Sequence, residues 1–251
     1  MKFHIFGDKN CPLIILIHGM MTPWQILRPA ADFFCKNYCV LIPELDGHTQ
    51  GCESTFSSID EEAKIIEEYV LKNFSQEVFA VCGLSMGGVI AYRLLLRNNL
   101  RIKNLIMDGA PLLGYGKFMS YVMTKQYLSI AEKSRKRHKK TLKNFSKVFL
   151  PEKYLNDFLS FIDYTSDESI RNIISSLKAS HISPILPTEN TKILYLHGTT
   201  MNEMLSKKTA RLIAKYYPTA CVVSFKGDSH CQGAIYEPVD WAKVVEDFFG
   251  R

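Results

Sequence analysis

An apolar run that passes directly into a helix is the feature that most constrains the fold of this chain. Residues 78–82 read Val-Phe-Ala-Val-Cys, and Gly83-Leu84-Ser85-Met86-Gly87 separates them from a helix-forming segment that begins near Gly88. So sharp a strand-to-helix turn needs glycines where side chains would collide with neighbouring backbone. The pattern predicts a strand–turn–helix unit with the Ser85 hydroxyl exposed above the edge of a sheet.

Short apolar runs alternate with amphipathic stretches along much of the chain. The expected strands are residues 13–17, 38–42, 78–82, 103–107, 192–196 and 220–225. The expected helices between and after them are residues 58–74, 89–97, 206–217 and 239–249. Helices that cross between parallel strands predict an α/β fold, with a mostly parallel central sheet flanked by helices.

The alternation is interrupted between residues 112 and 187, where helical segments such as 115–131 and 150–162 follow one another without a convincing strand. We therefore expect residues 1–111 and 188–251 to form the α/β core and residues 112–187 to form an inserted helical cap. A length of 251 residues suits one such domain.

Composition excludes several classes of protein. With 47% hydrophobic and 22% charged residues, the chain is too apolar for disorder and too polar for a membrane bundle. Charged residues occur near the N-terminus before any apolar stretch reaches the length of a signal-peptide core or a transmembrane helix. We therefore expect no signal peptide and no integral membrane segment. The seven scattered cysteines indicate reduced thiols and a cytoplasmic location.

Cofactor motifs are missing from the sequence. Cysteines and histidines lack zinc-like spacing, and carboxylates form no pattern typical of calcium or two-metal sites. The glycine-rich residues 83–88 lack the ending of a phosphate-binding loop and the spacing of a dinucleotide fingerprint. We expect no metal and no other cofactor.

Positive charge is concentrated at residues 133–140, which hold six basic side chains, while the whole chain carries a net charge of +6. Such a run is typical of contacts with nucleic acid, an anionic lipid surface or an acidic substrate, and equally of a solvated helix face. Because no aromatic residues alternate with these charges, the solvated face is the favoured interpretation and we expect no nucleic-acid partner.

The exposed hydroxyl of Ser85 is a candidate nucleophile, and a serine hydroxyl needs a base within hydrogen-bonding reach to act as one. His230 follows the last expected strand in Gly227-Asp228-Ser229-His230, downstream of Ser85, and is the candidate base. His18 and His48 lie in turn motifs and are expected to position loops.

Two backbone N–H groups are candidates for stabilising an oxyanion. That of Met86 begins the helix after Ser85, and that of Met20 follows another strand end. Trp24 and Met21 would line an apolar acyl pocket or belong to the core.

The ordered set of His18-Gly19-Met20, Asp46-Gly47-His48, Gly83-x-Ser85-x-Gly87-Gly88 and the late His230 resembles the α/β-hydrolase superfamily over almost the whole chain. Within this superfamily, the chain resembles the small capped esterases and acylglycerol lipases best. This resemblance implies a mostly parallel sheet, a helical lid over the site, Ser85 as nucleophile and His230 as general base.

The chain departs from this family at the acid that orients the base. The acid normally follows the strand that ends here at residues 196–198, where no aspartate occurs. Counting the usual three residues forward from Gly198 reaches Met201, whereas counting back from the helix expected at residues 206–217 places Asn202 at the position of the acid. Glu203 is the next residue. Asp108 follows the preceding strand, where some lipases of this fold place their acid, and is the expected acid. Glu203, and Asn202 or an arrangement without an acid, remain the alternatives.

These features predict hydrolysis of a carboxylic ester with an apolar or amphipathic acyl group, and a small-molecule ester as the partner of the site. The same residues would serve a thioesterase, an amidase, an acyltransferase or a carbon–carbon bond hydrolase, because the cap sets the substrate. A ligand-binding protein of this fold with impaired turnover is the alternative from another class, motivated by Asn202.

Overall fold

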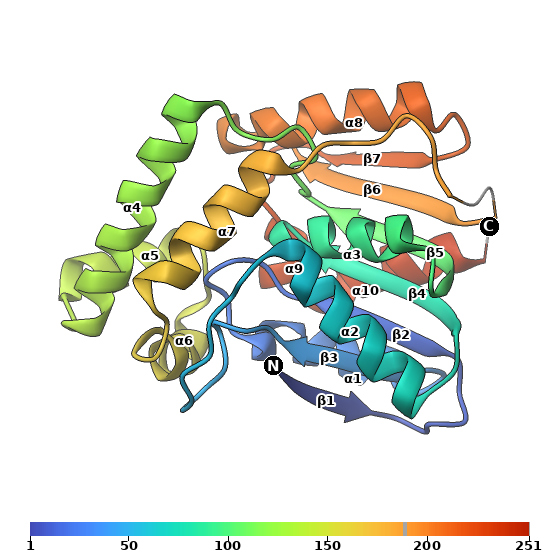
Figure 1. Cartoon of the computed structure of the whole chain (residues 1–251), viewed down its shortest axis with the longest axis horizontal. Coiled ribbons are helices and arrows are strands. Elements are labelled where there is room, and N and C mark those ends of the chain that lie inside the picture. Colours follow the sequence, from blue (N-terminus) through green and yellow to red (C-terminus); the bar gives the residue numbers. More distant parts are fainter. Residues whose placement is uncertain (188–189, 251) are drawn as a thin grey trace.

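The computed structural model describes residues 1–187 and 190–250, without the side chain of Val148. A seven-stranded sheet in the order β1-β3-β2-β4-β5-β6-β7 forms its centre (Figure 1). All neighbouring strands are parallel except β1, which pairs antiparallel with β3 at one edge. The strands are β1 (Lys2–Phe6), β2 (Leu13–Ile17), β3 (Cys39–Glu44), β4 (Glu77–Leu84), β5 (Arg101–Asp108), β6 (Lys192–Gly198) and β7 (Cys221–Phe225).

Alternate residues of the fully buried β2 enter two separate layers of core. Ile15 and Ile17 pack with apolar residues of the helices on one face, whereas Ile14 and Leu16 pack with those on the other. The first face is covered by α2 (Ile59–Asn73), α3 (Met86–Arg97) and α8 (Met204–Tyr216). The second is covered by α1 (Arg28–Phe34), α9 (Gln232–Tyr236) and α10 (Pro238–Phe249). The expected α/β fold is confirmed.

Between β5 and β6 the described chain forms helices and loops, and no strand. These helices are α4 (Lys117–Arg135), α5 (Lys139–Val148), α6 (Leu155–Ile162) and α7 (Asp167–Ala179), with a 3₁₀ turn at Glu152–Tyr154. They lie together beyond one end of the sheet, on the left of Figure 1. The predicted restart of the core at residue 188 lies outside the described residues.

Hydrogen bonds fasten this helical segment to the loop that follows β3. The Thr165 hydroxyl donates to the Gly47 carbonyl at 2.7 Å. The Phe56 N–H donates to Ser169 Oγ at 3.0 Å, and the Asn172 side chain donates to the Phe56 carbonyl at 3.0 Å. The start of α7 is therefore tied to the loop beside the carboxyl ends of the strands.

Candidate active site

Ser85 occupies the sharp turn between β4 and α3. Its backbone has φ 51° and ψ −114°, a conformation that residues other than glycine rarely adopt. Close backbone approaches surround it: a Cβ on Gly83 would lie 2.2 Å from the Gly87 carbonyl oxygen, and a Cβ on Gly87 would lie 2.3 Å from that of Ile17. The collisions expected from the sequence are thus present at both flanking glycines.

His230 meets Ser85 from the loop after β7. Its Nε2 lies 2.8 Å from Ser85 Oγ, and its Nδ1 is hydrogen-bonded to Glu203 Oε1. Because an ionised carboxylate only accepts, Nδ1 carries the proton and donates it to Glu203. Nε2 is then the free acceptor for the Ser85 hydroxyl, which is the tautomer that a general base requires.

Glu203 reaches His230 from a 3₁₀ turn, Met201–Glu203, directly after β6, and its side chain is fully buried. Burial by itself would raise the pKa of Glu203, but the hydrogen bond and charge of His230 hold this pKa below its ordinary value. Burial likewise acts to lower the pKa of His230, but the bond and charge of Glu203 raise it above its ordinary value. The two groups form a mutually stabilised ion pair when His230 is protonated.

The expectation that Asp108 is the partner of His230 is wrong in this structure, because its carboxylate is engaged elsewhere. Asp108 Oδ2 accepts a hydrogen bond from the Trp241 indole N–H at 3.0 Å. Asn202 is also excluded from His230, since its exposed amide oxygen accepts from the Thr200 hydroxyl at 2.6 Å. Of the three residues weighed from the sequence, the structure brings Glu203 to the base.

The candidate oxyanion donors are two backbone N–H groups beside Ser85. Met86 is the first residue of α3, so its N–H has no acceptor within the helix. Met20 follows Gly19, where an added Cβ would lie 3.5 Å from Ser85 Cβ. Among the described residues, neither N–H has a hydrogen-bond acceptor. The arrangement leaves two donors available close to the serine.

His18 and His48 hold the loop that carries Met20. His48 Nε2 accepts the Met21 N–H at 3.0 Å, and His18 Nε2 accepts the Leu45 N–H at 3.3 Å. Burial, with the neighbouring His48, lowers the pKa of His18 to about 3, and burial lowers that of His48 to about 4. Both rings are therefore neutral at physiological pH and tie two loops together, as their positions in turns predicted.

Packing accounts for Trp24 and Met21, the two residues considered for an acyl pocket. The Trp24 ring stacks on His4 of β1 with centroids 3.8 Å apart, and the Met21 side chain is buried in the core. Both residues pack against the core, and a role in an acyl pocket stays a prediction.

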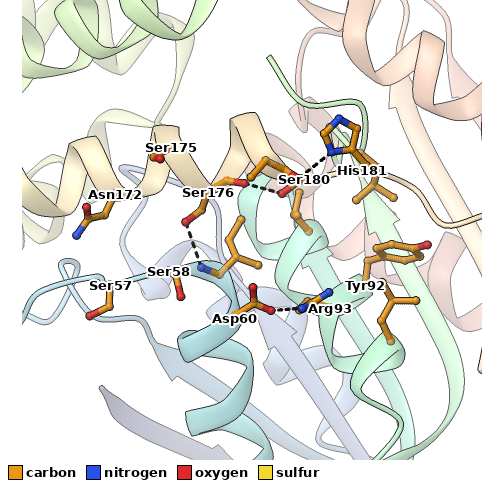
Figure 2. A pocket seen from close by; sticks show the side chains of 15 residues that line it. Ser57, Ser58, Asp60, Tyr92, Arg93, Asn172, Ser175, Ser176, Ser180 and His181 are labelled. Atoms are coloured by element: carbon orange, nitrogen blue, oxygen red, sulfur yellow. Dashed lines mark hydrogen bonds and ion pairs between the residues drawn. The ribbon is translucent and has the colours of Figure 1, made fainter. Parts of the chain in front are cut away.

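A separate cavity of about 470 Å³ lies between α2, α3 and α7 (Figure 2). Serine hydroxyls and the Asn172 amide line one side of it, and an ion pair between Arg93 and Asp60 lies at its edge. Ser85, His230 and Glu203 are not among its lining residues. Within residues 1–187 and 190–250, no group of three or more histidine, cysteine or acidic side chains is arranged to hold a metal ion.

Comparisons with known proteins agree with the fold. A family model for the α/β-hydrolase fold matches residues 12–232. A similar solved structure is an α/β-hydrolase family protein from Desulfitobacterium hafniense, with a TM-score of 0.76, 20% identity, and coverage of 98% of this chain and 99% of that one. A thermophilic esterase from Thermogutta terrifontis has a TM-score of 0.75 at 15% identity, covering 98% of this chain and 92% of that one. At these identities the likeness concerns the fold.

Sequence similarity to a curated protein is confined to part of the chain. Over 106 residues the chain is 24% identical to the pimeloyl-[acyl-carrier protein] methyl ester esterase of Nitrosomonas europaea. The matched region covers 42% of this chain and 40% of that protein.

Proposed function

The chain belongs to the α/β-hydrolase family, and from this membership we propose that it is a serine hydrolase that cleaves a carboxylic ester. The observation that carries the proposal is the hydrogen-bonded series from Ser85 Oγ through His230 to the buried Glu203. In this proposal Ser85 is the nucleophile, His230 the general base and Glu203 the acid that orients the base.

The reaction proceeds through an acyl-enzyme. His230 Nε2 takes the proton of Ser85 as Oγ attacks the ester carbonyl, and the N–H groups of Met20 and Met86 stabilise the oxyanion. The imidazolium, stabilised by Glu203, gives its proton to the leaving alcohol as the carbon–oxygen bond breaks. His230 then deprotonates water, which attacks the acyl group, releases the carboxylic acid and restores the Ser85 hydroxyl.

A small ester with an apolar or amphipathic acyl group is the proposed substrate. The methyl ester esterase from Nitrosomonas europaea supports an ester as the bond cleaved, though it resembles only part of the chain. We assign residues 112–187 the role of a cap over the site. The binding-only alternative loses its motivation, because it relied on an amide at the acid position whereas a carboxylate contacts His230.

Labelling by a fluorophosphonate probe, together with hydrolysis of short p-nitrophenyl esters, tests the proposal. We expect rapid labelling and ester turnover in the wild type, and neither in Ser85→Ala. Ser146→Ala, a serine on α5 whose hydroxyl bonds only the Lys143 carbonyl, is the matched control and should behave as wild type. A folded wild-type protein that is neither labelled nor active on esters and thioesters would contradict the proposal.

A further inference from the structure

The positive charge of this molecule is concentrated on α4 and α5. Residues 117–147 hold ten basic side chains and one acidic side chain, Glu132, so this segment alone carries more positive charge than the net +6 of the whole chain. The remainder of the chain is therefore net negative. Figure 1 places α4 at the outer edge of the molecule, on the side away from β7.

The structure divides the basic side chains of this segment into two groups. Arg135 donates to the carbonyls of Ile162 and Thr165 and to Asp167, and Arg137 binds Asp163 through two bonds of 2.7 Å. These arginines hold α4 against the loop between α6 and α7. They belong to the internal structure of the helical segment.

The lysines face solvent. Lys133, Lys139, Lys140, Lys143 and Lys147 are exposed, and none of them pairs with an acidic side chain among the described residues. On α5 the spacing of Lys139, Lys143 and Lys147 places them on one face, whereas Phe145 is buried. The helix is held by its apolar side and presents a row of unpaired cations on the other.

The beginning of α4 adds exposed apolar side chains to this charged surface. Phe118 is 79% exposed and Tyr121 is 62% exposed, and Met119 and Val122 are exposed beside them. The i, i+4, i+7 spacing of Phe118, Val122 and Lys125 sets apolar and basic residues in one stripe on the outer side of α4. Ser120, Ala131 and Ser134, which are buried, lie on the opposite side of the helix.

We propose that the outer surface of α4 and α5 docks the protein on an anionic lipid surface. The unpaired lysines of this docking surface contact the headgroups, and Phe118 and Tyr121 enter the interfacial region. Unpaired lysines spread over two helices suit a diffuse layer of negative charge, and exposed aromatic rings suit the boundary between headgroups and acyl chains. Nucleic acid is disfavoured, because both arginines of the surface are occupied in internal bonds.

Sedimentation of the full-length protein with vesicles tests the docking surface, and it requires no turnover of substrate. We expect binding to vesicles of phosphatidylcholine mixed with phosphatidylglycerol, and little binding to vesicles of phosphatidylcholine alone. Binding should weaken steeply as salt is raised above about 0.1 M, where the Debye length is about 10 Å. Equal binding to both vesicles, or to neither at low salt, would overturn the proposal.

Charge reversal on two helices provides the matched comparison. Lys139→Glu/Lys143→Glu/Lys147→Glu on α5 should weaken binding to the anionic vesicles by at least about 100-fold, since each lysine near such a surface contributes roughly a factor of five. Lys208→Glu/Arg211→Glu/Lys215→Glu, the same change of charge on exposed positions of α8, should have far less effect. Equal losses in the two variants would overturn the assignment to α5.

Two further measurements complete the test. Phe118→Ser/Tyr121→Ser should weaken vesicle binding while the salt dependence remains, and an unchanged affinity would exclude the aromatic contact. Each variant should retain wild-type circular dichroism, which shows that a loss of vesicle binding does not come from unfolding. Tight binding of a short DNA duplex at physiological salt, without vesicle binding, would assign the surface to nucleic acid and overturn the proposal.

Discussion

Two carboxylates lie near His230, and their surroundings give them different charges. Glu203 bonds the imidazole directly, and this interaction keeps its pKa below the ordinary value. Burial raises the pKa of Asp108 to about 7, although the charge of His230 and the bond from Trp241 oppose the rise. Glu203 is therefore ionised at neutral pH, whereas Asp108 is partly protonated and is the weaker stabiliser of an imidazolium.

The difference predicts unequal effects of two isosteric substitutions. Glu203→Gln should lower ester turnover by about two to four decades, because an amide neither stabilises the imidazolium nor enforces the correct tautomer. Asp108→Asn should change turnover by less than about tenfold, since its side-chain oxygen still accepts from Trp241. Steady-state kinetics on one ester, with circular dichroism as the folding control, checks both.

The pH profile separates a role in orienting the base from a merely structural one. In the wild type, kcat/KM should rise with pH as His230 loses its proton, with a midpoint above the ordinary histidine pKa of about 6.5. Glu203→Gln should move the midpoint downward, because the charge that raises the pKa is gone. An unmoved midpoint in this variant, or a larger loss of turnover in Asp108→Asn, would reverse the assignment.

The sequence identified Ser85 and His230 as candidates because each follows an expected strand, and the carboxyl ends of parallel strands meet at one edge of a sheet. The same reasoning did not identify the acid, because two counts of residues through the loop after β6 gave Met201 and Asn202, and Asp108 was preferred to Glu203. A 3₁₀ turn at residues 201–203 winds the chain so that Glu203, instead of Asn202, contacts the imidazole. The conformation of so short a turn depends on its tertiary contacts.

At the level of elements, the turn between β4 and α3 depends on the absence of a side chain at Gly87. An added Cβ would lie 2.3 Å and 2.5 Å from the carbonyl oxygens of Ile17 and His18, which are backbone atoms that have little freedom to move. Gly87→Ala should destabilise the fold by at least about 1–3 kcal/mol and displace the nucleophile. The thermal midpoint and the rate of fluorophosphonate labelling should both fall.

Gly116→Ala is the matched control for that substitution. Gly116 has an ordinary φ of −61°, and nothing lies within 4 Å of an added Cβ, so the change should cost no more than about 1 kcal/mol, from the weaker N-cap that alanine makes. Comparable losses of stability in the two variants would show that the close backbone approach at Gly87 is not the cause of the destabilisation.

Apolar runs in the sequence predicted the deeply buried elements better than the short or partly exposed ones. The strand expected at residues 13–17 is β2, every residue of which is buried. The edge strand β1 was missed because it is short and no residue of Lys2–Phe6 is fully buried, so the alternation of polar and apolar residues in Lys-Phe-His-Ile is too brief to identify a strand. Helix α1 was missed because it has only seven residues and lies between loops, so its amphipathic pattern is too short to identify a helix.

At the scale of the whole molecule, four buried groups couple folding to pH in two opposite directions. His18 and His48 remain neutral in the fold, so the unfolded chain binds their protons first and stability falls as pH drops below about 6.5. Asp108 keeps its proton in the fold until about pH 7. Burial and the charge of Asp46 raise the pKa of Glu62 to about 8. For these two carboxyls the stability falls as pH rises above about 4.

The opposing slopes predict a plateau of stability between about pH 4.5 and 6.5, followed by a decline toward pH 8. Of these four groups, only the carboxyls titrate differently in the two states over the upper range, and they should lower the free energy of unfolding there by about 2 kcal/mol. Denaturant unfolding at a series of pH values from 5 to about 9 measures this decline in the free energy of unfolding. Asp108→Asn/Glu62→Gln should flatten the decline, because neither amide titrates, while stability at pH 5 stays close to wild type. A decline of unchanged slope in the double variant would show that other groups, such as His230 with its raised pKa, dominate it.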